Sequence, residues 1–166
     1  RNDAASTVAL ARYIGSAFNS DQSAEVRFRI NGAGGNDNVH GCAVRLQPGS
    51  VSGYYVYVEP SAGSTNCYLG VANNGVHTYP FSTSLNGGAD GGRLRLTVTG
   101  VADETRLRID HNDGSGWVMV EDNIDPGVYF DGGYPGLAGW NNLGLVLIDE
   151  VTFTGQVVEP PIPPVV

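Results

Sequence analysis

The chain has 166 residues, of which 41% are hydrophobic and 16% charged, so it is long enough for one domain with a two-layer core. Its formal net charge is −8 and all nine basic residues are arginine, so the domain repels nucleic acid and anionic membrane surfaces. The chain lacks an uninterrupted apolar run of about 18 residues, so we expect no membrane insertion.

The first half of the chain predicts strands and turns. It begins with Arg1 and has no signal-like segment, so we expect a processed or excised piece. An apolar run at 8–14 predicts a first strand, and alternation over 24–31 predicts the next, with Val26 and Phe28 inward. After a loop rich in Gly and Asn, further strands are predicted at 42–47, 53–59, 67–72 and 77–82, the first three as a meander.

Residues 92–122 give the clearest strand signal. Leu94, Leu96 and Val98 alternate with Arg and Thr, and the same pattern continues over 106–110. A period of two is typical of a strand with one buried and one solvated face. Turns at 100–104 and at 112–114 separate the strands. The stretch therefore predicts antiparallel hairpins.

The last part of the chain holds an aromatic loop at 125–134, two further strands at 135–140 and 144–154, and a proline-rich tail at 157–166. Short strands at intervals of about 8–12 residues indicate an all-β antiparallel sandwich or barrel. The tail will not enter a sheet interior, so we interpret it as an extended linker or an assembly strap.

Cys42 and Cys67 could form a disulfide in an oxidising compartment. The predicted meander places them on strands that flank a middle strand, about 10 Å apart, which is beyond the roughly 7 Å that a disulfide allows between Cα atoms. A bond requires Cys42 to leave the sheet, so the possibility stays open.

Residues 92–155 resemble the concanavalin A-like lectin/glucanase jelly roll, in its laminin-G-like and carbohydrate-binding-module branch. The resemblance rests on the segments RLRLTVTG, TRLRIDHNDGSGW, PGLAGW and LIDEVTFTG. It implies a two-sheet antiparallel jelly-roll β-sandwich over 1–156, often extracellular and sugar-binding. It also implies a possible structural Ca²⁺ at Asp149, with Asp3 or Asp21 as its partner if the first and last strands pair.

Catalysis is not expected. Glycosidases need two carboxylates that face one another across the scissile bond. The adjacent acids Asp149 and Glu150 point to opposite faces of a strand, and Glu121 and Asp122 do the same. The three histidines, at 40, 77 and 111, stand in no recognisable catalytic pattern.

Two aromatic clusters are candidates for sugar binding, because sugars stack on aromatic faces and hydrogen-bond to planar polar groups. The first comprises Tyr55 and Tyr57 on one strand, with Arg45 and Tyr68 on its neighbours. The second comprises Tyr134, Trp140 and Asn141. Each has a structural alternative: tyrosines also cover sheet faces, and Phe130 and Trp140 could cap the core.

Four arginines on one hairpin face, at 93, 95, 106 and 108, could bind an anionic polysaccharide. Like charges on neighbouring strands repel unless acids compensate them. Because the chain has 17 acids, we expect compensation by residues such as Asp110 and Glu25. Trp117 is expected in the core.

The sequence thus predicts a non-catalytic, lectin-like module that binds a polysaccharide or glycan. We expect it outside the cell, at a cell surface or at a virion surface, as part of a larger protein. The alternative is a structural, self-assembling subunit such as a decoration or fibre protein, in which the tail inserts into a neighbouring copy.

Overall fold

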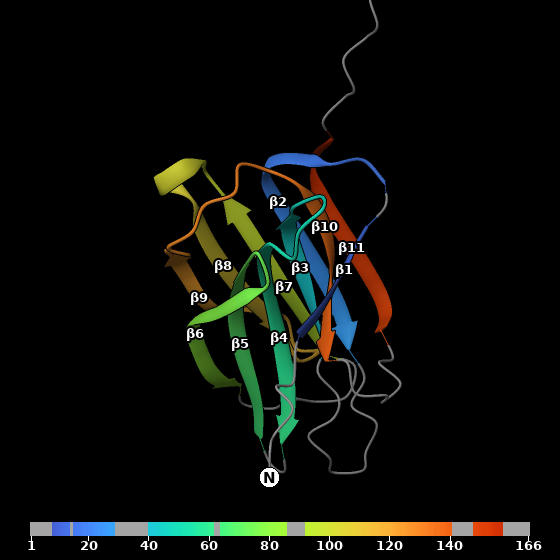
Figure 1. The fold of residues 1–166 in the computed structure, drawn as a ribbon. Coiled ribbons are helices and arrows are strands. Elements are labelled where there is room, and N and C mark those ends of the chain that lie inside the picture. Colours follow the sequence, from blue (N-terminus) through green and yellow to red (C-terminus); the bar gives the residue numbers. More distant parts are fainter. Residues whose placement is uncertain are drawn as a thin grey trace, which may run out of the picture.

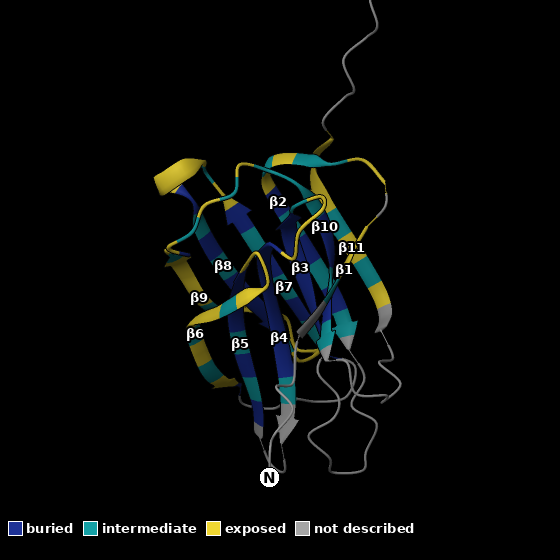
Figure 2. Cartoon of the chain, in the orientation of Figure 1, coloured by how far each residue is buried: buried dark blue, intermediate teal, exposed yellow. Residues whose placement is uncertain are grey.

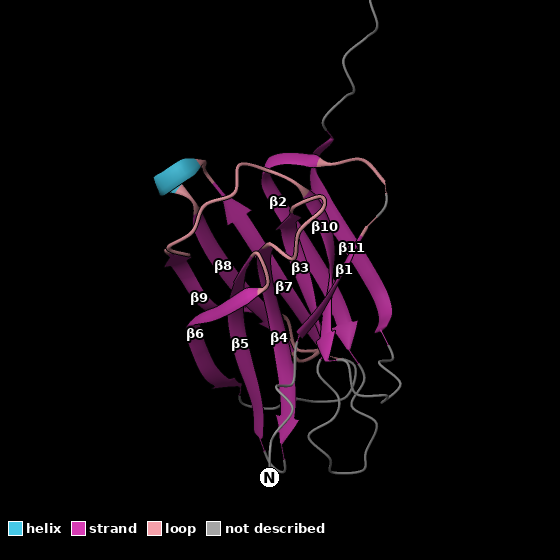
Figure 3. Ribbon diagram, viewed as in Figure 1, coloured by secondary structure: helices cyan, strands magenta, loops and turns pink. Residues whose placement is uncertain are grey.

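The computed structural model describes residues 8–13, 15–28, 40–61, 64–85, 92–140 and 148–157. Figure 3 shows that this part of the chain is almost entirely strand and connecting loop, apart from one short 3-10 turn, Ala102–Glu104. The strands are β1 (Val8–Arg12), β2 (Phe18–Phe28), β3 (His40–Leu46), β4 (Gly53–Ser61), β5 (Ser64–Asn73), β6 (Val76–Leu85), β7 (Arg93–Thr99), β8 (Arg106–Asn112), β9 (Trp117–Ile124), β10 (Tyr134–Trp140) and β11 (Ile148–Val157). Within the described residues, none forms a helix that is long and apolar enough to cross a membrane.

The strands form two antiparallel sheets packed face to face (Figure 1). In the part of the chain that the structure describes, sheet A has six strands in the order β1-β10-β3-β4-β5-β6, and sheet B has five in the order β11-β2-β7-β8-β9. The predicted two-sheet jelly-roll sandwich is confirmed. The meander β3-β4-β5 and the hairpins β7-β8 and β8-β9 are also confirmed.

The core lies between the sheets and follows the alternation in the sequence. On β7, Leu94, Leu96 and Val98 are fully buried, while the arginines between them are half-buried on the outer face. Sheet A contributes Val56 and Val58 from β4 to the same core. Figure 2 shows the buried residues along the central strands and the exposed ones along β6 and β9. Complete burial of each such side chain contributes about 1.5–3 kcal/mol.

The pairing of the terminal strands differs from the prediction. β1 pairs with β10, and β11 pairs with β2, so the first and last strands lie in different sheets. β2 also begins at Phe18, earlier than the predicted start. The prediction missed this part of the strand because residues 19–23 are all polar and show no alternation. Val157 belongs to β11, and the rest of the proline-rich tail lies outside the described residues.

Three of the four arginines on the outer face of sheet B are paired with acids, as predicted, whereas Arg106 donates to the backbone carbonyl oxygens of Asp103 and Thr105. Arg93 Nη1 lies 2.7 Å from Glu25 Oε1. The Asp110 carboxylate forms ion pairs with Arg95 Nη2 at 3.2 Å and with Arg108 Nη2 at 2.8 Å. The expected core position of Trp117 is wrong: it is 38% exposed on this outer face, where the Arg95 guanidinium lies 4.1 Å from the centre of its ring. This face is therefore scaffold.

The two cysteines are buried and unbonded, so the possible disulfide is not formed. Cys42 pairs with Val56 and Cys67 with Val58, on opposite sides of β4, as the geometric objection required. Cys42 remains in the sheet, and its Sγ lies 3.1 Å from the Ala24 carbonyl oxygen. Burial raises the pKa of both thiols to about 12, so both stay protonated at neutral pH.

Candidate functional site

Four tyrosines form a packed aromatic group on the outer face of sheet A. Tyr55 and Tyr57 are stacked with their ring centres 6.1 Å apart, and Tyr57 and Tyr68 with theirs 5.1 Å apart. Tyr79, from β6, meets all three rings edge-on at 6.3–6.4 Å. Such stacked and edge-on contacts contribute about 0.5–1.5 kcal/mol each beyond the buried area, so the group is a rigid unit.

Small residues on the neighbouring strands make room for these rings. Tyr55 lies opposite Gly70 on β5, where a Cβ atom would lie 2.1 Å from Tyr55 Cζ. Tyr57 lies opposite Gly41 on β3, where a Cβ atom would come within 2.7 Å of Tyr57 Cβ. The absence of a side chain at Gly70 therefore lets the Tyr55 ring lie over β5, while Gly41 allows the close approach of β3 to the backbone of β4.

Tyr55 and Tyr57 support the group and do not form its surface. Their exposed fractions are 0% and 4%, so neither ring offers a face to a ligand. The Tyr55 hydroxyl and His77 Nδ1 share a hydrogen bond of 2.8 Å. Burial, followed by the neighbouring Tyr79, raises the pKa of the Tyr55 hydroxyl above its ordinary value. The expectation that these two rings face a ligand is therefore wrong, because Tyr68 and Tyr79 pack against them and they have almost no exposed surface.

The exposed end of the group is formed by Tyr68, which is half-buried, and Tyr79, which is 47% exposed. Tyr57 covers one face of Tyr68, and within the described residues no ring stacks on the other. Beside Tyr68, the cross-strand row Glu59, Asn66 and Ser84 continues the same outer face. We call this surface the tyrosine platform; it comprises Glu59, Asn66, Tyr68, Tyr79, Ser82 and Ser84.

The polar groups of the platform are oriented. Ser84 Oγ donates a hydrogen bond of 3.0 Å to Asn66 Oδ1, which fixes the orientation of the amide and makes its NH₂ group a donor on this face. Burial and the Glu59 carboxylate raise the pKa of Tyr68, so its hydroxyl stays protonated beside that carboxylate. The platform therefore combines an aromatic face with a donor, a carboxylate acceptor and hydroxyls.

Arg45 does not reach the outer face as predicted. It lies at a bulge with φ 52°, where β3 pairs irregularly with β10, and its side chain turns into the sandwich with no exposed surface. There its guanidinium donates to the carbonyl oxygens of Ser20, Gly100 and Phe130 and to Thr105 Oγ1. Arg45 is therefore a structural residue, since a bulge reverses the face that simple alternation assigns.

The second predicted cluster is divided. Tyr134 is half-buried against the outer layer of sheet A, with the Arg12 guanidinium 4.5 Å from its ring centre. The Trp140 side chain and Asn141 lie outside the described residues, so their roles stay predictions. Phe130 packs on Tyr54 with ring centres 5.2 Å apart, which confirms that it caps the core.

The predicted calcium pair of Asp21 and Asp149 is wrong. Asp149 lies on β11 beside Arg27 and Phe28 of β2, whereas Asp21 lies near the other end of that strand, about 20 Å away at about 3.3 Å per residue. Asp21 Oδ1 instead accepts a 3.0 Å hydrogen bond from the Gly100 amide. Asp3 is outside the described residues, and among those described no three His, Cys, Asp or Glu side chains gather as metal ligands.

Sequence reasoning missed most of the platform. Asn66 and Glu59 could have been found, because each lies two residues from a tyrosine of the group and so shares its face. Tyr79 gave no such signal. The pairing of β5 with β6 is irregular between Leu69 and Val71, and this irregularity brings Tyr79 over the other rings.

The two described histidine side chains predict a pH-dependent stability. Burial lowers the pKa of His77 and of His111 below the ordinary value of about 6.5. The unfolded chain therefore binds more protons than the folded one, and stability present above about pH 6.5 is lost as the pH falls through the lowered pKa values. We expect the urea midpoint to fall between pH 7 and 5, and to fall less in His77→Gln. An equally steep fall in that variant would contradict the assignment to His77.

Comparison with known proteins supports the fold. No protein-family model and no curated protein matches the sequence. Among solved structures, the carbohydrate-binding module CBM66 from Bacillus subtilis is similar at 16% identity and a TM-score of 0.56, over 92% of this chain and 81% of that one. A functionally unknown protein from Saccharomyces cerevisiae is similar at 20% identity and a TM-score of 0.50, over 88% and 75%.

Scytalido-glutamic peptidase also matches, at 13% identity over 93% of this chain and 84% of that one, but its TM-score of 0.45 is too low to support an argument. The resemblance to the jelly-roll lectins is thus confirmed at the level of the fold. This chain is an all-β, two-sheet jelly-roll sandwich of the kind that the Bacillus subtilis carbohydrate-binding module also adopts.

Proposed function

We propose that this domain is a non-catalytic carbohydrate-binding module and that the tyrosine platform is its glycan site. The observation that carries the proposal is the exposed end of the aromatic group, where Tyr68 and Tyr79 meet at 74° beside Asn66 and Glu59. The C–H face of a sugar ring stacks on Tyr68, with Tyr79 as a side wall. The Asn66 NH₂ group and the Glu59 carboxylate hydrogen-bond to adjacent hydroxyls.

The rigidity of the platform favours binding. Tyr57 holds Tyr68 from below and Ser84 fixes Asn66, so little side-chain freedom is lost when a ligand binds. The ligand would be neutral or weakly polar, since the described residues of the platform include one carboxylate and no basic side chain. A flat surface of this kind suits a stretch of polysaccharide chain.

The same surface supports a binding role over catalysis. Hydrolysis of a glycosidic bond needs a second carboxylate about 5–10 Å from the first. Within the described part of the platform Glu59 has no such partner. Our proposal includes display outside the cell, where polysaccharides are exposed.

Replacement of Tyr68 by alanine tests the site. We expect an approximately tenfold weaker affinity for the polysaccharide that the native domain binds, equivalent to about 1.4 kcal/mol, because one stacking face is lost. A glycan array identifies the ligand and affinity electrophoresis measures the change. Tyr129→Ala is the matched control, since Tyr129 is an exposed loop tyrosine outside the platform.

Tyr129→Ala should bind like the native domain. No glycan signal from a folded native monomer would refute the carbohydrate proposal. Loss of binding in Tyr129→Ala but not in Tyr68→Ala would move the site to the aromatic loop. Size-exclusion chromatography with and without residues 158–166 tests the structural alternative, in which the tail drives assembly.

A further inference from the structure

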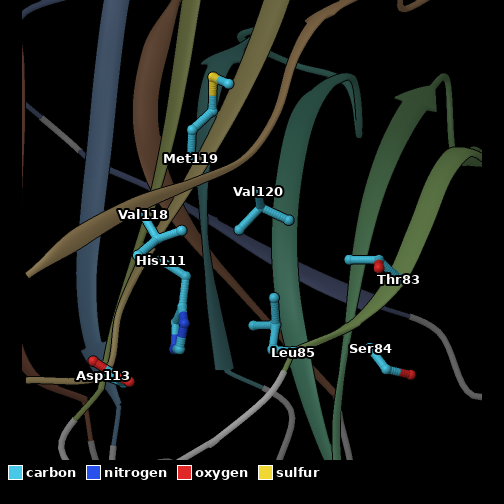
Figure 4. Close-up of a pocket in the computed structure, with 8 residues that line it drawn as sticks. All are labelled: Thr83, Ser84, Leu85, His111, Asp113, Val118, Met119 and Val120. Atoms are coloured by element: carbon cyan, nitrogen blue, oxygen red, sulfur yellow. The ribbon is translucent and has the colours of Figure 1, made fainter. Parts of the chain in front are cut away.

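One side of the sandwich is open between the edge strands of the two sheets. β6 is the last strand of sheet A and β9 the last strand of sheet B, and a cleft of about 360 Å³ lies between them. Figure 4 shows its lining, with Leu85 from β6, His111 from β8 and Val118 from β9 around the hollow, and Asp113 at one end. The tyrosine platform uses the outer face of sheet A, so this cleft is a separate feature that shares only the rim residue Ser84.

The β9 side of the cleft exposes apolar side chains that an ordinary sandwich buries. Val118 pairs with His111, whose side chain is buried, yet Val118 itself is 62% exposed. Met119, next to it, is 54% exposed. Exposed apolar residues on an edge strand are unusual in a monomeric protein, because they invite pairing with another strand.

The two edges beside the cleft differ in their protection. β6 carries Pro80, which has no N–H group and so opposes the addition of a strand. In the second half of β9, two backbone amides already donate to side-chain carboxylates and are not available to an added strand. The Asp122 amide donates to Glu121 Oε1 at 3.1 Å, and the Asn123 amide donates to Asp122 Oδ1 at 2.8 Å. Within the described residues, no side chain hydrogen-bonds to the backbone of 117–120, so this short edge is open.

Acids stand on both sides of the open edge. Asp113 precedes it, and Glu121 and Asp122 follow it. Hydrogen bonds from Ser115 lower the pKa of Asp113, so its carboxylate is charged at neutral pH. Among the described ion pairs none involves Asp113 or Glu121. Antiparallel pairing of two copies through 117–120 would bring these acids together, so like-charge repulsion disfavours a second copy.

We propose that the β9 edge at 117–120 binds an extended, basic segment of a partner protein by strand addition. The partner strand pairs with β9 and so continues sheet B. Its inward side chains enter the cleft against Val118 and Leu85, and its basic residues meet Asp113 at one end and Glu121 at the other. Main-chain hydrogen bonds supply affinity, while the cleft and the acids supply specificity.

The probe is the end-blocked peptide KKVTVTKK, labelled and titrated with the full chain at low salt by fluorescence anisotropy. We expect binding that weakens as salt rises, because the flanking charges are exposed. EEVTVTEE reverses the charge and KKVPVTKK removes a central N–H donor, so both should bind at least tenfold more weakly. Equal binding of either control peptide would overturn the proposal.

Variants of the chain locate the site. Val118→Lys places a cation at the edge and should weaken KKVTVTKK binding about tenfold, and Asp113→Asn about threefold. Val76→Lys is the matched control, since Val76 is 67% exposed at the far end of β6, and it should change nothing. Undiminished binding in both Val118→Lys and Asp113→Asn would refute the site. If the native chain formed a concentration-dependent dimer that Val118→Lys dissociates, the occupant of the edge would be a second copy of this chain. That result would overturn the proposal of a basic partner.

Discussion

Replacement of Arg45 by methionine is expected to destabilise the domain by about 4 kcal/mol, which lowers its Tm by about 8–16 °C. Methionine fills the space of the side-chain stem but donates no hydrogen bond. The Ser20 carbonyl oxygen accepts a 2.9 Å hydrogen bond from Arg45 Nε, and the Phe130 carbonyl oxygen accepts one of 2.6 Å from Arg45 Nη1. Both oxygens would lose this buried donor. A buried polar group left without its partner costs about 1–3 kcal/mol.

The size of the expected effect follows from where Arg45 lies. Its contacts connect the start of β2, the turn after β7 and the aromatic loop before β10, so one residue ties three separate segments at this end of the sandwich. Burial lowers the pKa of Arg45, but nearby Tyr54 and the carboxylates of Asp131 and Asp21 oppose that shift. The guanidinium therefore remains charged and its hydrogen bonds are charge-assisted.

Chemical denaturation of purified variants measures the effect. Arg45→Lys keeps the charge but not the planar fork, and it should recover less than half of the lost stability. Arg106→Met is the matched control, because Arg106 is half-buried and its hydrogen bonds to described residues go to the nearby carbonyl oxygens of Asp103 and Thr105. It should cost less than about 1 kcal/mol. Equal stability of Arg45→Met and Arg106→Met would contradict the structural role of Arg45.

Replacement of Gly70 by alanine is expected to cost about 2–3 kcal/mol and to weaken glycan binding at the same time. The new Cβ atom would lie 2.1 Å from Tyr55 Cζ, and the ring cannot move aside because it is buried, stacked on Tyr57 and hydrogen-bonded to His77. Overpacking of a filled site costs about 1–3 kcal/mol. Because Tyr55 stacks on Tyr57 and Tyr57 stacks on Tyr68, a shift of Tyr55 moves Tyr68 and so disturbs the platform as well.

A double-mutant cycle isolates this contact. In a Tyr55→Leu background the ring is gone, so Gly70→Ala should cost less than about 0.5 kcal/mol. Thr152→Ala is the control, because Thr152 is an exposed strand residue on β11, outside the platform, and should change neither stability nor glycan binding. An unchanged cost of Gly70→Ala in the Tyr55→Leu background would show that the strain arises elsewhere.

The interior of this sandwich holds a polar network that links the core to its loops. Gln22 Oε1 accepts from the Arg45 amide, and its Nε2 donates to the carbonyl oxygens of Asn19 and Gly133. The Tyr54 hydroxyl donates to the Val128 carbonyl oxygen at 2.8 Å and accepts from the Phe130 amide at 2.9 Å. Buried networks of this kind specify a unique arrangement when all their members are satisfied. They explain why the aromatic loop is a fixed part of the fold.

The sequence by itself determined the fold class and the location of the main hairpins. The alternation over Leu94–Val98 and over Leu107–Ile109 needs one buried and one solvated face, and a strand that pairs out of register would expose its whole apolar set. The same reasoning anticipated that Glu25 pairs with Arg93 and that Asp110 pairs with Arg95 and Arg108, because like charges on neighbouring strands must be compensated.

Only the tertiary structure decided which aromatic and charged residues lie on the outer surface of the sandwich. Arg45 turns inward at a bulge, and Tyr79 reaches the platform through an irregular strand pair. Alternation assigns faces correctly only while pairing is regular, because one extra residue reverses the face of all that follow. Burial of Tyr55 and Tyr57 likewise depends on Gly70 and Tyr79, which lie on other strands, so their exposure is a property of the assembled sheet and not of their own strand.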